Sequence, residues 1–173
     1  MNSQKTIQLP DPEQLLANLA QQLVPVITSN TALVGIHSGG VWIMERLLPL
    51  LSTQHEIEQG SLDITFYRDD FAHRGLRVEN KPSKIAFDVE DKHIILIDDI
   101  FYTGRTTRGA MNELFDYGRP ASISLAVLIN RGGRELPITP QFFGAEIPLQ
   151  PHQKLQLSRD EQGKFSLALE ENK

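Results

Sequence analysis

The chain has 173 residues, of which 40% are hydrophobic and 23% are charged; this is the size and composition of one α/β domain and excludes wholesale disorder. Its 17 basic and 22 acidic residues give a net charge of −5, which argues against a general nucleic-acid coat, and the absence of cysteine excludes disulfide scaffolds, thiol catalysis and cysteine-ligated metals. We find no signal-peptide pattern and no apolar run near the roughly 20 residues that a membrane helix needs, so we expect a cytoplasmic protein without a membrane segment.

The first third of the chain predicts two helices with a buried strand between them. Asp11-Pro12, followed by leucines at helical spacing, predicts an N-capped helix that Pro25 limits. Residues 32–36 form an apolar run that enters a glycine loop at 37–40, and residues 41–51 predict the second helix. Apolar and polar side chains then alternate over residues 62–67, which predicts another strand.

Residues 68–91 change character and predict a flexible flap. The segment is polar and charged and includes Gly75 and Pro82; loops of this length in a compact domain are usually functional lids or disordered. One interpretation is a solvated surface loop. The other, which we favour, is a lid whose arginines Arg68, Arg74 and Arg77 close over the substrate and exclude water.

The second half of the chain predicts alternating strands and a helix. A buried strand at 93–97 is followed by a loop at 98–106, a helix at 107–117 that Gly118 ends, a buried strand at 123–129 and a terminal hairpin at 154–169. Continuous apolar strands that alternate with helices are typical of a parallel sheet covered on both faces. With no repeats or linkers, residues 1–173 predict a single α/β domain.

The segment from the strand at 93–97 into the next helix predicts a phosphate and ribose site. Ligands of open α/β sheets bind at the carboxyl ends of strands, and a helix N-terminus binds anions through its free amides and its dipole. The threonines in 103–107 add hydroxyl donors and Gly104 allows close backbone approach, so this end of the loop favours phosphate. Asp98 and Asp99 repel phosphate but suit a vicinal diol or a metal ion. A ligand with both a diol and a phosphate is a ribose 5-phosphate. The Walker and GxGxxG patterns are absent, which disfavours nucleoside-triphosphate hydrolysis and dinucleotide binding.

Residues 94–106 closely resemble the phosphoribosyl-diphosphate (PRPP) motif of type I phosphoribosyltransferases. The flanking FYRDD at 66–70 and RGGRELPI at 131–138 are similar to the PyrR family, whose members are described as pyrimidine-operon attenuation regulators and uracil phosphoribosyltransferases. The resemblance implies a type I phosphoribosyltransferase fold with a central parallel sheet, flanking helices, a flexible flap and a small hood. It also implies synthesis of UMP and diphosphate from uracil and PRPP with Mg²⁺. A homo-oligomer, in the simplest case a dimer, is expected.

The resemblance also assigns the site residues. Asp98 and Asp99 are the catalytic pair, which meets the ribose hydroxyls, while the metal ligands stay undefined. The residues that bind PRPP or UMP are Ser38, Gly39, Gly40, Asp98, Asp99, Tyr102, Thr103, Gly104, Arg105, Thr106, Thr107 and Arg131.

Three departures from the family pattern leave alternatives open. Gly39 replaces an arginine in the loop that binds diphosphate, and Asn130 replaces an acid that helps to hold magnesium in related transferases. No Lys or Arg occurs over residues 6–45, so the first helix is poorly equipped for RNA, whose affinity depends on phosphate neutralisation. RNA binding is therefore disfavoured. The two alternatives are an RNA-binding, UMP-sensing regulator with weak catalysis and a purine phosphoribosyltransferase.

Overall fold

A computed structural model of the protein describes residues 8–52, 54–64 and 83–171. The N-terminal half contains α1 (Pro12–Leu23), a 3₁₀ turn (Val24–Val26), β1 (Thr31–Ile36), α2 (Gly39–Leu51), β2 (Glu58–Leu62) and β3 (Lys84–Ile85). The C-terminal half contains β4 (His93–Phe101), α4 (Arg105–Tyr117), β5 (Ser122–Asn130), β6 (Phe142–Glu146), β7 (Gln153–Arg159) and β8 (Phe165–Glu171). Among the described residues, no helix has the length and apolar character needed to cross a bilayer.

The centre of the fold is a six-stranded sheet with the order β3-β2-β1-β4-β5-β6. Every pair from β2 to β6 is parallel, and only the short edge strand β3 runs antiparallel, against β2. β1 and β4 lie side by side in the middle, so the loops that follow them open at the same edge. The predicted parallel sheet is confirmed, with one antiparallel strand added at its edge.

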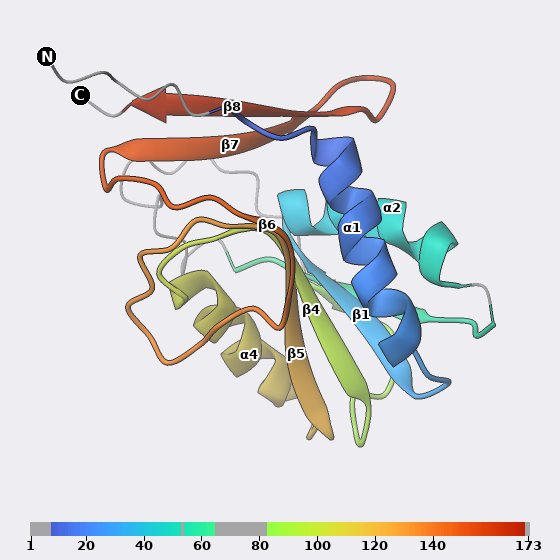
Figure 1. Ribbon diagram of the computed structural model, residues 1–173. Helices are drawn as coiled ribbons and strands as arrows, with labels where there is room; N and C mark the ends of the chain where they lie inside the picture. The colour runs from blue at the N-terminus through green and yellow to red at the C-terminus, as the bar shows by residue number, and fades with distance from the viewer. Residues whose placement is uncertain (1–7, 53, 65–82, 172–173) are drawn as a thin grey trace, which may run out of the picture.

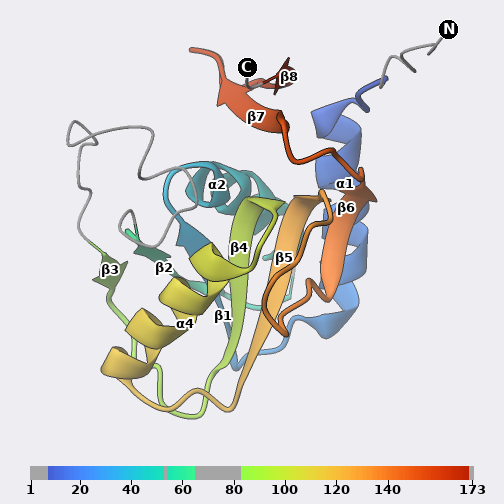
Figure 2. The same cartoon turned by 90° about the vertical axis from the view of Figure 1, so that its left-hand side faces the viewer.

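Helices cover both faces of this sheet, because its central strands are apolar on both sides. Leu33 and Ile95 face a cluster formed with α1 and α2, whereas Val34 and Leu96 face a second cluster formed with α4. Figure 2 shows α4 on one side of the sheet and α1 on the other. This alternation has the period of two that a strand requires, and it explains why continuous apolar runs in the sequence form buried strands.

The predicted terminal hairpin is confirmed as β7 and β8, which we call the hood. Figure 1 shows it across the carboxyl end of the large sheet, and β7 contacts both β4 and α2. Arg46 of α2 donates to the Glu13 carboxylate and to the Gly163 carbonyl oxygen, and the Phe165 amide also donates to Glu13. The hydrogen bond from Arg46 lowers the pKa of Glu13. A second arginine, Arg159, pairs with Glu45 and stacks on Trp42 of α2.

Two predicted boundaries are wrong, and two strands were not predicted. The strand expected at 62–67 instead occupies Glu58–Leu62; its first residues are polar and exposed, so they carry no alternating signal, and residues 65–67 lie outside the described residues. The loop expected at 98–106 shrinks to three residues, because β4 pairs with β5 as far as Phe101 and α4 begins at Arg105. The strands that the sequence did not predict are β3 and β6.

The predicted flap overlaps the described residues only at 83–91. There strand β3 pairs with β2 and the Val89 side chain is fully buried, while Lys84, Asp88 and Glu90 are exposed, so this end of the range is attached to the domain but partly exposed. The flap arginines Arg68, Arg74 and Arg77 lie outside the described residues, and their role stays a prediction.

Candidate functional site

The candidate site lies at the carboxyl edge of the sheet, where β1 and β4 end next to each other. Asp98 and Asp99 belong to the last residues of β4, the glycine loop after β1 leads into α2, and a three-residue loop after β4 leads into α4. The structure thus brings together the glycine loop, the acidic pair and the phosphate loop that the sequence predicted as one site.

The two carboxylates differ in exposure, and each accepts a hydrogen bond from the backbone amide of the next residue. Asp98 is buried, with 6% of its surface exposed, and Asp99 is half-buried. The Asp98 carboxylate accepts a 2.9 Å hydrogen bond from the Asp99 amide, and the Asp99 carboxylate accepts a 2.8 Å bond from the Ile100 amide. These bonds orient the two carboxylates at the end of β4.

Glycines allow α2 to begin directly against the acidic pair. A Cβ atom at Gly39 would lie 2.3 Å from an Asp99 carboxylate oxygen, and a Cβ atom at Gly40 would lie 2.1 Å from the Ile97 carbonyl oxygen. Distances below 3 Å do not occur between real Cβ atoms and such neighbours. A side chain at position 39, including the arginine of the family pattern, therefore requires Asp99 to move.

The N-termini of α2 and α4 both face this edge, and the first amide of α4, that of Arg105, donates to the Thr103 hydroxyl. Neither Ser38, the N-cap of α2, nor Gly104, the N-cap of α4, makes a side-chain capping bond. By contrast, Asp11 caps α1 by accepting a hydrogen bond from the Glu13 amide, at a helix end that follows no strand of the sheet. Uncapped amides at a helix N-terminus attract anions. The two helix ends are therefore our candidate positions for binding anions.

The phosphate loop, residues 102–104, is a tight turn held from outside by the segment 131–138. Gly104 has a φ of 94°, which favours glycine. The Thr103 carbonyl oxygen accepts hydrogen bonds from the amides of Glu135 and Leu136, at 2.9 and 3.2 Å. Arg105 pairs with the Glu135 carboxylate. The specific RELPI block of the sequence therefore supports the backbone of the phosphate loop.

The three threonines of the predicted phosphate site are not equivalent. Thr103 and Thr107 are buried, whereas Thr106, at the second position of α4, is half-buried. The Thr103 hydroxyl accepts a 3.2 Å bond from the Arg105 amide, which makes it part of the turn. Thr106 is therefore the threonine whose hydroxyl is best placed to reach a ligand.

Arg131 and Asn130 lie at the end of β5, beside the phosphate loop. Arg131 is buried, its guanidinium stacks on the Tyr102 ring at 3.8 Å from the centroid, and it donates to the Gln150 carbonyl oxygen at 3.2 Å. The Asn130 side-chain oxygen accepts a bond from the Gly132 amide at 3.3 Å. The sequence placed Arg131 near the site but carried no signal for its stacking partner or for Gln150.

The acidic pair fits a magnesium ion that arrives with a diphosphate substrate. Mg²⁺ prefers oxygen ligands, keeps several waters and is commonly held by one or two carboxylates together with substrate phosphates. Asp99 is partly exposed beside the α2 N-terminus, so its carboxylate can supply such an oxygen. The described residues contain no group of three or more His, Cys, Asp and Glu side chains that would hold a metal without the substrate.

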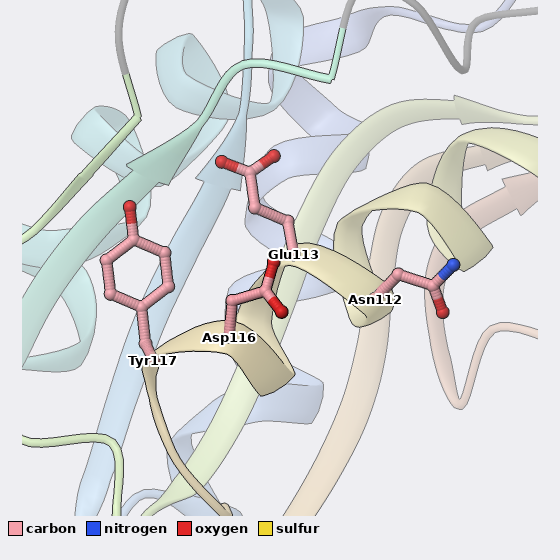
Figure 3. A pocket seen from close by; sticks show the side chains of 4 residues that line it. All are labelled: Asn112, Glu113, Asp116 and Tyr117. Carbon is pink, nitrogen blue, oxygen red and sulfur yellow. The ribbon is translucent and has the colours of Figure 1, made fainter.

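A cavity of about 370 Å³ lies elsewhere, at the C-terminal half of α4 (Figure 3). Its lining residues are Asn112, Glu113, Asp116 and Tyr117. Glu113 accepts a hydrogen bond from Ser83, whose hydroxyl oxygen accepts another from the Asp63 amide. The lining contains two carboxylates and no basic side chain, so this cavity does not suit a phosphate.

Comparison with known sequences finds relatives over most of the chain. The profile described as "Phosphoribosyl transferase domain" matches residues 4–156. The chain is 45% identical over 153 residues to the "Bifunctional protein PyrR" of Nitrosococcus oceani, an alignment that covers 88% of this chain and 86% of the relative. It is 42% identical over 166 residues to the protein of the same name from Pseudomonas syringae pv. syringae, with 94% of both chains covered.

Comparison with solved structures shows the same fold. A hypoxanthine phosphoribosyltransferase from Staphylococcus aureus superposes with a TM-score of 0.62 at 19% identity, over 83% of this chain and 78% of the other. A hypoxanthine-guanine phosphoribosyltransferase from Bacillus anthracis superposes with a TM-score of 0.64 at 18% identity, over 83% and 85% of the two chains. At these identities the similarity establishes the architecture and leaves the base unspecified.

Proposed function

This chain belongs to the PyrR family of phosphoribosyltransferases, and we propose that it transfers the 5-phosphoribosyl group of PRPP to uracil, forming UMP and diphosphate. The family and the fold support the transferase reaction. The names of the relatives and the motifs shared with the PyrR family support uracil as the acceptor.

The observation that carries the proposal is the contact between Gly39 and the Asp99 carboxylate. In PRPP the diphosphate on C1 and the hydroxyl on C2 are on neighbouring carbons, so their binding groups must also be neighbours. The start of α2 and the acidic pair meet in van der Waals contact, and the start of α4 follows three residues after β4. We therefore assign diphosphate to the α2 N-terminus, the ribose diol to Asp98 and Asp99, and the 5-phosphate to residues 103–107.

The proposed chemistry is a glycosyl transfer in which uracil N1 forms a bond to ribose C1. The bond between C1 and the diphosphate oxygen breaks, diphosphate leaves with both bonding electrons, and the N1 proton is released. The protein contributes positioning and charge stabilisation, since the two helix N-termini attract the phosphates and the carboxylates hold the ribose. Asp99 is our candidate protein ligand for Mg²⁺, which, when bound with PRPP, would supply positive charge to the diphosphate.

A substrate panel tests the assignment of the base. Purified protein is incubated with PRPP and Mg²⁺ and one base at a time: uracil, hypoxanthine, guanine, xanthine or orotate. Nucleotide formation is followed by chromatography and mass spectrometry, and a reaction without protein is the control. We expect UMP from uracil and no product from the purines. Nucleotides formed from hypoxanthine or guanine, with uracil unused, would instead support the purine alternative.

We leave RNA regulation outside the proposed function. The exposed side chains of α1 include no basic residue, and its Glu13 is occupied by Arg46. Without phosphate-neutralising side chains this surface gives little affinity for RNA. A filter-binding titration with pyrimidine-operon leader RNA, in the presence of UMP at two salt concentrations, would reveal tight binding if it exists.

We propose a homodimer and a cytoplasmic location on the family assignment alone.

A further inference from the structure

We propose that Arg131 is a positioning residue that connects the phosphate loop to the hood, so that binding of the 5-phosphate strengthens binding of the nucleobase. This inference rests on the proposed function for the identity of the two ligands. We call residues 147–150, which connect β6 to the hood, the strap. In this inference Arg131 acts through its contacts with Tyr102 and the strap and not through direct contact with substrate.

Arg131 holds the phosphate loop from one side. Its amide donates to the Phe101 carbonyl oxygen at 3.0 Å, and its guanidinium covers the ring of Tyr102, the first residue of the loop. The ring also lies against Gly133, where a Cβ atom would be only 2.5 Å from Tyr102 Cε2. Gly133 has a φ of 81°, so the chain turns back tightly at this point. Tyr102 thus packs against both Arg131 and Gly133.

Arg131 also holds the strap. Its carbonyl oxygen accepts a 3.1 Å bond from the Leu149 amide, and its guanidinium donates to the Gln150 carbonyl oxygen at 3.2 Å. The same Gln150 carbonyl accepts a 2.9 Å bond from the amide of Gln153, the first residue of β7. A single carbonyl group therefore separates the Arg131 guanidinium from the first residue of the hood.

These contacts make a continuous connection between two ligand positions. A phosphate at the α4 N-terminus fixes residues 102–104, whose first side chain is stacked on Arg131. The hood lies across the carboxyl edge, where the base must sit once the ribose is held by Asp98 and Asp99. Arg131 is 5% exposed, so its position depends on these protein partners and little on solvent. Coupling between sites requires such packed, hydrogen-bonded contacts at both ends.

The first test uses the wild-type protein and ribose 5-phosphate, which lacks a base. Hydrogen exchange of individual amides is measured by NMR with and without this ligand. We expect the Leu149 amide to exchange about tenfold more slowly when ribose 5-phosphate is bound, a typical size for coupling between sites. Bound ribose 5-phosphate that leaves the exchange of Leu149 unchanged would overturn the inference.

The second test separates coupling from simple structural support. Arg131→Met removes the charge, and Arg131→Lys keeps a cation and a donor. We expect the uracil KM of Arg131→Met to rise about tenfold while its PRPP KM changes less than about twofold, and Arg131→Lys to recover part of the loss. Arg119→Met is the matched control, because Arg119 also stacks on a ring, that of Phe115, and donates to a backbone carbonyl, but at the far end of α4.

The outcomes distinguish this inference from the proposed function. If the wild-type protein makes no UMP but ribose 5-phosphate still protects Leu149, the coupling stands and uracil transfer does not. If the wild-type protein makes UMP and Arg131→Met has a wild-type uracil KM, or raises the uracil and PRPP KM values equally, or if Arg119→Met raises the uracil KM as much as Arg131→Met does, the coupling is wrong and uracil transfer stands. Should Arg131→Met fail to fold, Arg131→Lys and the wild-type exchange measurement decide the question.

Discussion

Replacing each of the two glycines at the start of α2 by alanine separates the chemistry of the site from the stability of the fold. In Gly39→Ala the new methyl group would lie 2.3 Å from the Asp99 carboxylate oxygen and 2.8 Å from the Asp99 Cβ atom, so the whole Asp99 side chain would have to shift. In Gly40→Ala it would lie 2.1 Å from the Ile97 carbonyl oxygen, which belongs to the central strand of the sheet. The first clash displaces a proposed ribose ligand, and the second displaces backbone.

The magnitudes follow from what has to move. Overpacking against Asp99 costs about 1–3 kcal/mol, while alanine gains about 1 kcal/mol over glycine in a helix, so Gly39→Ala should lose about 0–2 kcal/mol of folding stability. Loss of a charge-assisted hydrogen bond to the ribose should cost about 1.5–3 kcal/mol, which is roughly a 10- to 150-fold fall in kcat/KM. Gly40→Ala should lose about 1–3 kcal/mol of folding stability through overpacking, or roughly 2–12 °C in Tm.

Steady-state UMP synthesis and thermal unfolding followed by circular dichroism measure the two effects on the same preparations. We expect Gly39→Ala to lose activity with at most a modest fall in Tm, and Gly40→Ala to melt earlier than Gly39→Ala. A Gly39→Ala variant with wild-type kcat/KM for PRPP would show that Asp99 does not contact the ribose, and the reasoning from the glycine contact would fail.

Three further predictions address single side chains. Asp98→Asn and Asp99→Asn should each lower kcat/KM by about 10- to 150-fold without changing the circular dichroism spectrum, because each loses a charge-assisted hydrogen bond; wild-type rates in both would end the ribose assignment. Thr106→Val, which keeps the shape but removes a phosphate donor, should weaken UMP binding about tenfold by calorimetry, and unchanged affinity would move the phosphate site. The Glu13 pKa is lowered by Arg46 from its ordinary 4.5, so this ion pair stabilises the fold above pH 4.5 and is lost as the pH falls through the lowered value. Glu13→Gln should therefore reduce Tm at pH 7 and have little effect at pH 2, and an equal reduction at both values would contradict the linkage.

Much of the fold could be predicted because local signals and tertiary structure agree. The sequence pattern correctly located three features: the helix cap at Asp11, the apolar strands around Leu33 and Leu96, and the terminal hairpin. β6 was missed because Phe142–Glu146 has a glycine at its centre and no alternation. β3 is only two residues long and exists through its pairing with β2, which no local pattern encodes.

The composition of the site could be predicted, but its contacts could not. The acidic pair and the TGRT segment are adjacent in sequence, so their chemistry is visible there. The approach of Gly39 to Asp99 depends on β1 lying next to β4 in the sheet. The hydrophobic periodicity of a strand does not specify which strand will be its neighbour. The stacking of Arg131 on Tyr102 likewise depends on the register that pairs Phe101 with Asn130.

The most direct test of the central claim is an NMR titration of the ¹⁵N-labelled protein with UMP. If the carboxyl edge of the sheet binds a 5-phosphorylated ribose, the largest amide shifts should fall on residues 103–107, with further shifts at Asp98, Asp99 and the start of α2. Shifts confined to the cavity at residues 112–117, or no shift at a saturating concentration of UMP, would contradict the assignment of this edge as the substrate site.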